Sequence, residues 1–341
     1  MYLENRSASF KKLHTIFCQE IPDFIKEFLE VKEVLRLNKI CQHGGTTYTK
    51  AGIHSQYNSR LDHSLGVALI VWNFTKDVTQ TITALLHDIS HTAFSHTGEF
   101  IKGDFLILES NEKEMGNVIK NSKGIMKLLD KYNVSLTDIT EITKYPLVDN
   151  DTPKICADRL EYTLHDGFLF GNITLDEAEK VYNDIYIGYN EEGQQEYVFN
   201  NVEHAKKLSE LAINNSYKRY TCFCIERYLA EILKNMIKEN LIQYNDLFYN
   251  NDEQIFDIAR NSKNTKINTM LDAYFNIDYA SKYSDVYVEN KFCVPTTVKK
   301  RFIKPLINID NKVQRLESNQ IEEYLNMQIP FYQYLELPNI D

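Results

Sequence analysis

The sequence has few turn-forming residues, with only 12 glycines and 7 prolines among 341 residues. Architectures built from many tight hairpins need such residues and long helices do not, so the composition favours an α-rich protein. The sequence also lacks an uninterrupted apolar run of about 18 residues, and its first residues contain no apolar segment of the signal-peptide type. We therefore expect a cytoplasmic protein that does not cross a membrane.

Regular cysteine spacing and an excess of positive charge are also absent. The six cysteines form no CxxC pair, so we expect free thiols in a reducing compartment. The formal net charge of −10 disfavours bulk binding to nucleic acid, because such binding depends on clustered lysine and arginine. A small anion such as a nucleotide can still bind in a locally basic pocket.

Apolar residues recur at helical spacing along most of the chain. This periodicity predicts helices over residues 24–40, 60–75 and 80–91. A further helix is expected over residues 152–166, with Thr152 as its N-cap. With 43% hydrophobic and 25% charged residues, the composition is that of a globular protein and excludes a disordered one.

Alternating apolar and polar residues indicate a small β component. One such stretch lies at 188–199, and others follow residue 281. No linker divides the chain sharply. We predict a predominantly all-α fold in which residues 1–280 form one helical domain and residues 281–341 a small α+β C-terminal extension.

Candidate metal ligands lie in or beside three predicted helices: His63, the adjacent pair His87 and Asp88, and the distant Asp158. Imidazole and carboxylate together suit Mn, Fe, Co, Ni, Zn or Mg better than a metal that prefers thiolates. Neighbouring residues of a helix point about 100° apart, so the adjacent pair can hold one ion only at a helix end or across a shared cleft. The pattern predicts a divalent metal site where several helices meet.

Three blocks surround these residues, RLDHSLGV (60–67), HDISHTAFSH (87–96) and DRLEYTLHD (158–166). In this order they resemble the HD superfamily of metal-dependent phosphohydrolases, and within it the deoxynucleoside triphosphate triphosphohydrolases. The resemblance covers about residues 30–170 and weakens towards about 310. It implies a helical HD-domain bundle, a nucleotide substrate and a homo-oligomer.

The resemblance also implies roles for individual residues. His63, His87, Asp88 and Asp158 correspond to the family's metal ligands. His91 and His96 correspond to the histidines beside the scissile phosphate, and His91, four residues after His87, is the candidate general acid. The implied substrate-binding residues are Gln42 at the sugar, Arg60 and Arg159 at phosphate, and Tyr162 and Asp166 on the helical face of Asp158.

The implied reaction is attack of water on the α-phosphorus of a nucleotide, with departure of deoxynucleoside and triphosphate. Two departures from the family pattern keep other reactions open. Asn111-Glu112 stands where relatives have His-Glu, and the segment expected to supply an arginine for the terminal phosphate offers only Lys218 or Arg219. The alternatives are a nucleotidase, a cyclic-nucleotide phosphodiesterase, or a non-catalytic nucleotide-binding regulator.

Other polar residues have simpler interpretations. The remaining histidines, including His43 and His165, lack a matching partner and are expected to be structural or exposed. The basic run 299–301 is interpreted as a solvated face, with an effector-binding role as the less favoured alternative.

Overall fold

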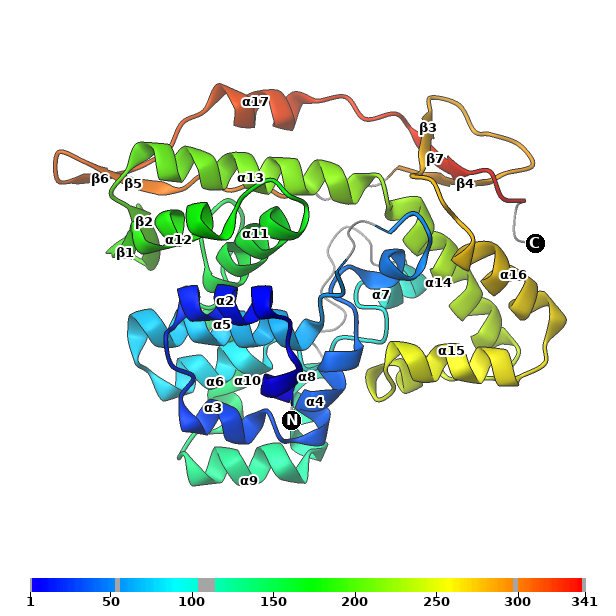
Figure 1. The fold of residues 1–341 in the computed structure, drawn as a ribbon, viewed down its shortest axis with the longest axis horizontal. Helices are drawn as coiled ribbons and strands as arrows, with labels where there is room; N and C mark the ends of the chain where they lie inside the picture. The colour runs from blue at the N-terminus through cyan, green and yellow to red at the C-terminus, as the bar shows by residue number, and fades with distance from the viewer. Residues whose placement is uncertain (1, 53–55, 104–113, 297–299, 339–341) are drawn as a thin grey trace.

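The computed structural model describes residues 2–52, 56–103, 114–296 and 300–338. Helices predominate in this part of the chain, and short strands form two small sheets (Figure 1). The expected helical fold with a small β component is thus confirmed in its broad form. None of the helices in these ranges is both long and apolar enough to span a membrane.

Most of the helices pack around a first apolar core, which includes the fully buried Phe17, Leu65 and Leu160. The helices of this part are α1 (Tyr2–Asn5), α2 (Ala8–Phe17), α3 (Asp23–Phe28), α4 (Lys32–Arg36), α5 (Arg60–Thr75), α6 (Val78–Leu86), α8 (Met115–Asn121), α9 (Lys123–Lys131), α10 (Leu136–Thr140), α11 (Ala157–Leu169) and α12 (Leu175–Asn183). Short 3₁₀ helices are η1 (Leu37–Lys39) and η4 (Ile142–Lys144).

A second apolar core lies at the other end of the molecule and includes Ile225, Leu229 and Tyr274. The helices around it are α14 (Phe223–Lys238), α15 (Asp252–Asn261) and α16 (Thr265–Phe275), with η5 (Tyr244–Phe248). The 3₁₀ helix η2 (Gly44–Tyr48) and helix α7 (Thr97–Lys102) pack on α14. The long helix α13 (Val202–Tyr220) leads from the first core to α14, as Figure 1 shows.

The strands link late parts of the chain to earlier ones. One sheet has the order β1-β2-β5-β6, formed by β1 (Ile185–Tyr189), β2 (Gln195–Phe199), β5 (Leu306–Ile309) and β6 (Lys312–Arg315). The other has the order β3-β7-β4, formed by β3 (Lys282–Ser284), β7 (Tyr332–Leu335) and β4 (Phe292–Pro295). Helix α17 (Asn319–Asn326) lies beside α13 in Figure 1. The domain boundary at residue 280 stays a prediction, although β5 pairs with β2 in parallel across it.

Three predicted helices differ from those observed. The helix over 80–91 is observed as α6, which ends at Leu86, because a turn closed by His91 N donating to Asp88 O at 3.0 Å follows it. The helix over 24–40 is divided into α3, α4 and η1, because Val31 is extended and packs on Gly124, where an added Cβ would lie 2.9 Å from Val31 Cγ1. The helix over 152–166 starts later, because the preceding residues form a turn closed by Lys154 N donating to Asp151 O at 3.0 Å. Cys156, not Thr152, is the N-cap of α11.

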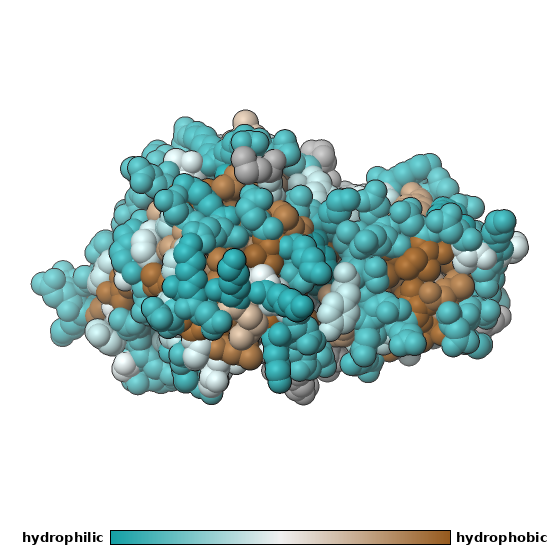
Figure 2. Space-filling view, turned by 90° about the horizontal axis from the view of Figure 1, so that it is seen from below, coloured by the Kyte–Doolittle hydropathy of each residue, from teal (hydrophilic) through white to brown (hydrophobic). Residues whose placement is uncertain are grey.

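All six cysteines are free and buried, as predicted. The face of the molecule shown in Figure 2 is mostly hydrophilic, with apolar residues reaching the surface in two areas. Oligomerisation stays a prediction.

Candidate active site

Helix α5 fixes the position of the first candidate ligand. The Ser59 side chain accepts a hydrogen bond from Asp62 N, and the Asp62 side chain accepts one from Ser59 N, which together form a capping box. This cap determines where α5 begins, so Arg60 and His63 lie in its first turn. Both side chains are buried. The local sequence therefore positions two functional candidates before any tertiary contact is considered.

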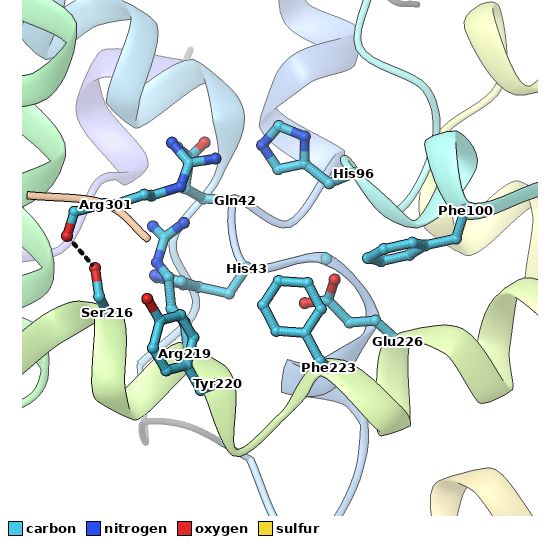
Figure 3. A pocket seen from close by; sticks show the side chains of 11 residues that line it. Gln42, His43, His96, Phe100, Ser216, Arg219, Tyr220, Phe223, Glu226 and Arg301 are labelled. Atoms are coloured by element: carbon cyan, nitrogen blue, oxygen red, sulfur yellow. Dashed lines mark hydrogen bonds between the residues drawn. The ribbon is translucent and has the colours of Figure 1, made fainter. Parts of the chain in front are cut away.

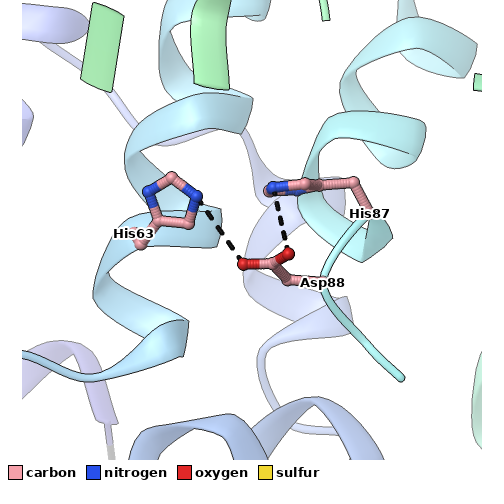
Figure 4. Close-up of side chains that lie close together, drawn as sticks. All are labelled: His63, His87 and Asp88. Atoms are coloured by element: carbon pink, nitrogen blue, oxygen red, sulfur yellow. Dashed lines mark ion pairs between the residues drawn. The ribbon is translucent and has the colours of Figure 1, made fainter. Parts of the chain in front are cut away.

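Helix α6 ends at Leu86, and His87 and Asp88 follow directly. The pair therefore lies at a helix end, which is the condition for both side chains to face one ion. Figure 4 shows His63 from α5 pointing towards His87 and Asp88. Possible ligand atoms of these three residues lie within 4.8 Å of one another.

Asp158, in the first turn of α11, completes the cluster. Its Oδ1 lies 3.0 Å from His63 Nε2 and 3.6 Å from His87 Nε2. Asp88 faces the same two imidazoles, with its oxygens 3.6 Å from His63 Nε2 and 3.5 Å from His87 Nε2. The structure thus brings together all four residues proposed as ligands, from three separate elements.

The histidine tautomers fit metal binding through Nε2. His87 donates its Nδ1–H to the Ala84 carbonyl at 2.7 Å, and its Nε2 is buried with no hydrogen-bond partner among the described residues. His63 donates its Nδ1–H to the Glu161 carboxylate, because a carboxylate can only accept. In metalloproteins such outer hydrogen bonds orient ligating imidazoles and raise their basicity. The cluster can therefore hold a divalent ion, the predicted cofactor.

The charges of the cluster are strongly coupled. Burial alone would raise the pKa of Asp88, but His87 and Arg60 outweigh it and hold that pKa well below its usual range. Burial would lower the pKa of His63, but Glu161 and Asp158 outweigh it and raise that pKa to about 10. A cation binding between His63 and Asp158 therefore replaces a proton, which links metal binding to pH.

Arg60 and the two candidate catalytic histidines lie beside the cluster. Arg60 donates to Asp88 Oδ2 at 2.7 Å and to Ser95 Oγ at 2.8 Å. His91 Nε2 lies 3.1 Å from Asp88 Oδ1, and the rings of His91 and His96 meet edge to face with centroids 5.0 Å apart. His96 donates its Nδ1–H to Glu99 at 2.9 Å, which leaves Nε2 for a ligand.

A pocket adjoins this histidine pair (Figure 3). It is lined by residues from four segments of the chain, namely Gln42, His43, Gly44, His96, Phe100, Ser216, Arg219, Tyr220, Phe223, Glu226 and Arg301. Two of the predicted site residues, Gln42 and His96, line it. Gln42 Oε1 is buried and has no hydrogen-bond partner in the described part of the chain. It is therefore available to accept a hydrogen bond from a ligand.

Asp166 is engaged within the protein beneath this pocket. Its Oδ1 accepts from His43 Nε2 at 2.7 Å and its Oδ2 from Arg219 at 2.6 Å. Burial would raise the pKa of Asp166, but Arg219 and His43 outweigh it and hold that pKa far below its usual range. No local pattern in the sequence indicates this role of His43, since its partner lies 123 residues away.

Tyr162 and Arg159, both on α11, have different partners. The guanidinium groups of Arg219 and Arg301 lie over the Tyr162 ring, 5.7 and 5.9 Å from its centroid. Arg159 instead donates to Lys154 O at 2.8 Å and to Asn150 Oδ1, so its guanidinium is held by the loop before α11. Its proposed phosphate contact stays a prediction.

Sequence reasoning missed Glu161 and Arg301. Glu161 is fully buried and joins His63 to His165, accepting from His165 Nδ1 at 2.7 Å. Arg301 belongs to the basic run that was interpreted as a solvated face, yet it lines the pocket. Lys299 of that run lies outside the described residues, as does the Asn111-Glu112 segment.

Comparison with known proteins agrees with this geometry. Residues 60–149, which carry three of the four cluster residues, match the HD domain family. The chain is 28% identical over 260 residues to the uncharacterized protein YdhJ of Bacillus subtilis, covering 74% of this chain and 75% of that one. It is 33% identical over 159 residues to the metal-dependent phosphohydrolase cns2 of Cordyceps militaris, covering 47% and 45% of the two chains.

Two more distant similarities extend the comparison. A deoxynucleoside triphosphate triphosphohydrolase SAMHD1 homolog of Dictyostelium discoideum is 20% identical over 194 residues, covering 48% of this chain and 36% of that one. A crystal structure of a hypothetical protein from Aquifex aeolicus shares the fold, with a TM-score of 0.61, 17% identity and 93% of each chain covered. The chain spans less than half of the two phosphohydrolases named here.

The match over residues 60–149 shows an HD domain in this part of the chain, and the imidazole–carboxylate cluster provides residues that could hold a divalent metal ion. Together with the similarity to the metal-dependent phosphohydrolase cns2, these observations support an HD-domain phosphohydrolase that depends on a metal.

Proposed function

We propose that this phosphohydrolase acts on nucleotides, and that it cleaves a deoxynucleoside triphosphate into deoxynucleoside and inorganic triphosphate. The observation that carries the proposal is the continuity of the site. The cluster of His63, His87, Asp88 and Asp158 leads through His91 and His96 into the pocket that contains Gln42. A nucleotide is a ligand that presents phosphate to a metal and a nucleoside to an adjoining pocket.

A divalent ion held by the cluster supplies a Lewis acid for a phosphoryl oxygen and acidifies water. The chain's own residues bind and orient the substrate. The Arg301 guanidinium, 5.9 Å from the centroid of the Tyr162 ring, gives the pocket wall positive charge for phosphate. Gln42 offers an unpaired amide oxygen to a sugar hydroxyl.

The proton balance assigns a role to the histidine pair. Water adds to the α-phosphorus, the bond from phosphorus to the sugar 5′-oxygen breaks, and the 5′-oxygen must receive a proton. Burial and Arg60 lower the pKa of His91 to about 4, so its imidazole is neutral before substrate binds. The negative charge of the phosphates favours the imidazolium, so we expect His91 to take up its proton as the substrate enters.

One observation favours a second candidate, a nucleotidase or cyclic-nucleotide phosphodiesterase. Two arginines that could hold a long phosphate chain are engaged elsewhere, Arg159 by Lys154 and Asn150, and Arg219 by Asp166. A substrate with a single phosphate needs fewer cations. Arg301 favours the triphosphate as substrate. Among the described residues no carboxylate forms an ion pair with its guanidinium, which lies over the Tyr162 ring.

The test is product identification with purified protein. Each deoxynucleoside triphosphate, monophosphate and cyclic nucleotide is incubated with Mn, Fe, Co, Ni, Zn or Mg, and the products are separated by ion-exchange chromatography. The proposal expects inorganic triphosphate and deoxynucleoside in equal amounts from the triphosphates. The His87→Ala variant is the control for contaminating phosphatases.

Other products would decide between the alternatives. Orthophosphate from a monophosphate would establish a nucleotidase, and a linear monophosphate from a cyclic substrate a phosphodiesterase. If no nucleotide in the panel is cleaved faster by the wild type than by His87→Ala, the enzymatic proposal is wrong.

A further inference from the structure

Glu226, in the first turn of α14, places a carboxyl group in the wall of the pocket. Its recorded hydrogen bond is a long one, in which Thr46 Oγ1 donates to Glu226 Oε1 at 3.3 Å. Within the described ranges, no lysine, arginine or histidine lies at ion-pair distance from it. The Glu226 side chain is only partly buried and lines the pocket, so a ligand bound there can provide the donors that the protein does not.

The nearest cations are committed to other carboxylates. Arg219 is bound to Asp166 at 2.6 Å, and Arg60 to Asp88 at 2.7 Å. Burial raises the pKa of Glu226 to about 7, and Arg219 and the Thr46 hydrogen bond only partly oppose this shift. The buried Glu99 carboxylate adds repulsion. A ligand that brings N–H donors would therefore stabilise the ionised form.

The chain also keeps the space around this carboxyl group small and shaped. Gly44 has φ +60°, and a Cβ added there would lie 3.2 Å from Glu226 Cδ and Oε1. Glycine thus allows the loop before η2 to approach the carboxyl group. Because that loop also carries Gln42, which faces the same pocket, Glu226 is within the ligand's reach.

Aromatic rings flank the carboxyl group. Phe100 of α7 and Phe223 of α14 have ring centroids 5.8 Å apart at an interplanar angle of 71°. Figure 3 shows the Glu226 carboxyl group beside these two rings, at the opposite end of the pocket from Arg301. The pocket therefore has a cationic end and an end that combines flat apolar surfaces with one acceptor group. A pocket that places apolar aromatic rings beside one polar group is suited to a nucleobase.

We propose that the Glu226 carboxylate reads the hydrogen-bonding edge of the base and selects guanine. The inference rests on the proposed nucleotide substrate. Guanine is the common base that presents two neighbouring donors, N1–H and the 2-amino group, and a carboxylate offers two acceptor oxygens at matching spacing. Adenine and cytosine each present a donor next to an acceptor, which an ionised carboxylate meets with only one favourable contact. Glu226 is thus a specificity-determining residue.

The test measures nucleoside binding, because this does not depend on turnover. Isothermal titration calorimetry at pH 8 compares deoxyguanosine, deoxyinosine and deoxyadenosine. Deoxyinosine lacks only the 2-amino group, so it isolates one hydrogen bond to the carboxylate. Loss of a hydrogen bond to a charged group predicts that deoxyinosine binds about 10-fold more weakly than deoxyguanosine, with deoxyadenosine weaker still.

Two variants locate the effect. Glu226→Gln replaces one acceptor by a donor and should bring deoxyguanosine and deoxyinosine to within about twofold of each other, mainly by weakening deoxyguanosine binding. The matched control is Glu231→Gln, on the same helix, whose carboxylate pairs with Lys234 at 2.6 Å and does not line the pocket. Glu231→Gln should keep the wild-type preference. Circular dichroism and metal content establish that both variants fold.

The outcomes separate this inference from the proposed function. Equal affinity of the wild type for the three nucleosides, no detectable binding of any of them, or a guanine preference that survives in Glu226→Gln would each overturn the role of Glu226. If the nucleosides bind with the expected preference but no nucleotide is hydrolysed, the proposed reaction fails and the recognition by Glu226 stands. If nucleotides are cleaved without base preference, the proposed reaction stands and the recognition of guanine by Glu226 fails.

Discussion

Glu161 offers a sharp test of how the metal cluster is held. Its carboxylate is fully buried and accepts from two imidazoles, His63 Nδ1 and His165 Nδ1. The variant Glu161→Gln keeps the size of the side chain but provides only one acceptor oxygen and turns the other atom into a donor. The Nδ1–H of either His63 or His165 would then face the N–H group of the new amide, and two donors would be opposed.

The two possible amide orientations differ in consequence. If the amide nitrogen faces His63, the imidazole avoids the clash only by giving up its Nδ1 proton and keeping one on Nε2, the atom that faces Asp158 and would bind the ion. If it faces His165, that imidazole can move its proton to its own Nε2, which has no recorded hydrogen-bond partner. The second orientation costs less, so we expect metal binding to be weakened but not abolished.

The expected loss is about 10- to 100-fold in metal affinity, the usual effect of changing a residue that supports a metal ligand. This corresponds to about 1.4 to 2.8 kcal/mol. The dissociation constant for Mn or Co is measured by competition with a chelating indicator at pH 7.5. Glu33→Gln is the control, since this carboxylate accepts from Ser122 Oγ at 2.8 Å, lies 3.5 Å from Lys32 Nζ and is not part of the cluster.

Unchanged metal affinity in Glu161→Gln, with the same melting temperature as the wild type, would refute this account of the cluster. A loss of affinity that merely follows a loss of folded protein would refute it as well. Both quantities must therefore be measured on the same preparations.

Three further predictions concern the ligands, the pocket and the core. Asp88→Ala should reduce bound metal from about one ion per chain to near zero by elemental analysis, because it removes a ligand that faces both imidazoles; retention of wild-type metal content would contradict the assignment. Arg301→Ala should raise KM for the nucleotide substrate about 10-fold and leave metal content unchanged, since its guanidinium meets the phosphates rather than the ion; steady-state kinetics that show an unaltered KM would count against it. Leu69→Ala, in the fully buried middle of α5, should lower the free energy of unfolding by about 2 to 5 kcal/mol in urea titrations, because it leaves a cavity in the first core; a change below about 1 kcal/mol would show that this part of the core is loosely packed.

The helices that carry the cluster were predictable because their signals are local. Helix α5 has an apolar sequence and a capping residue at Ser59, and the periodicity of 80–91 indicates α6. The requirement that two adjacent residues share one ion predicted that His87 and Asp88 lie at a helix end or across a shared cleft, and the structure has them at a helix end. The convergence of α5, α6 and α11 followed from the family resemblance, not from any of these helices alone.

The positions of the other side chains of the site depend on contacts that no local sequence pattern indicates. The guanidinium of Arg159 follows the turn at Asp151–Lys154, which supplies its acceptor, and this turn also delays the start of α11. His43 gained a partner only because its loop packs against α11. Arg301 enters the pocket from a segment that looks like an ordinary basic surface in the sequence. Each of these positions is fixed by contacts between residues far apart in the chain.

The parallel pairing of β5 with β2 determines the order in which the site can be assembled during synthesis. The proposed ligands His63 to Asp158 all emerge from the ribosome in the first half of the chain, together with the helices that hold them. Strand β2 can pair through Val198 only after Leu306 of β5 has been synthesised. The segment that contains Arg301, which accepts from Ser216 Oγ of α13 at 2.9 Å, is therefore added late. Domains fold from the N-terminus as they are made, and closing a long loop costs entropy. The proposed metal ligands can therefore come together before the pocket that contains Arg301 exists, and a premature stop near residue 300 would leave this cluster with an incomplete pocket.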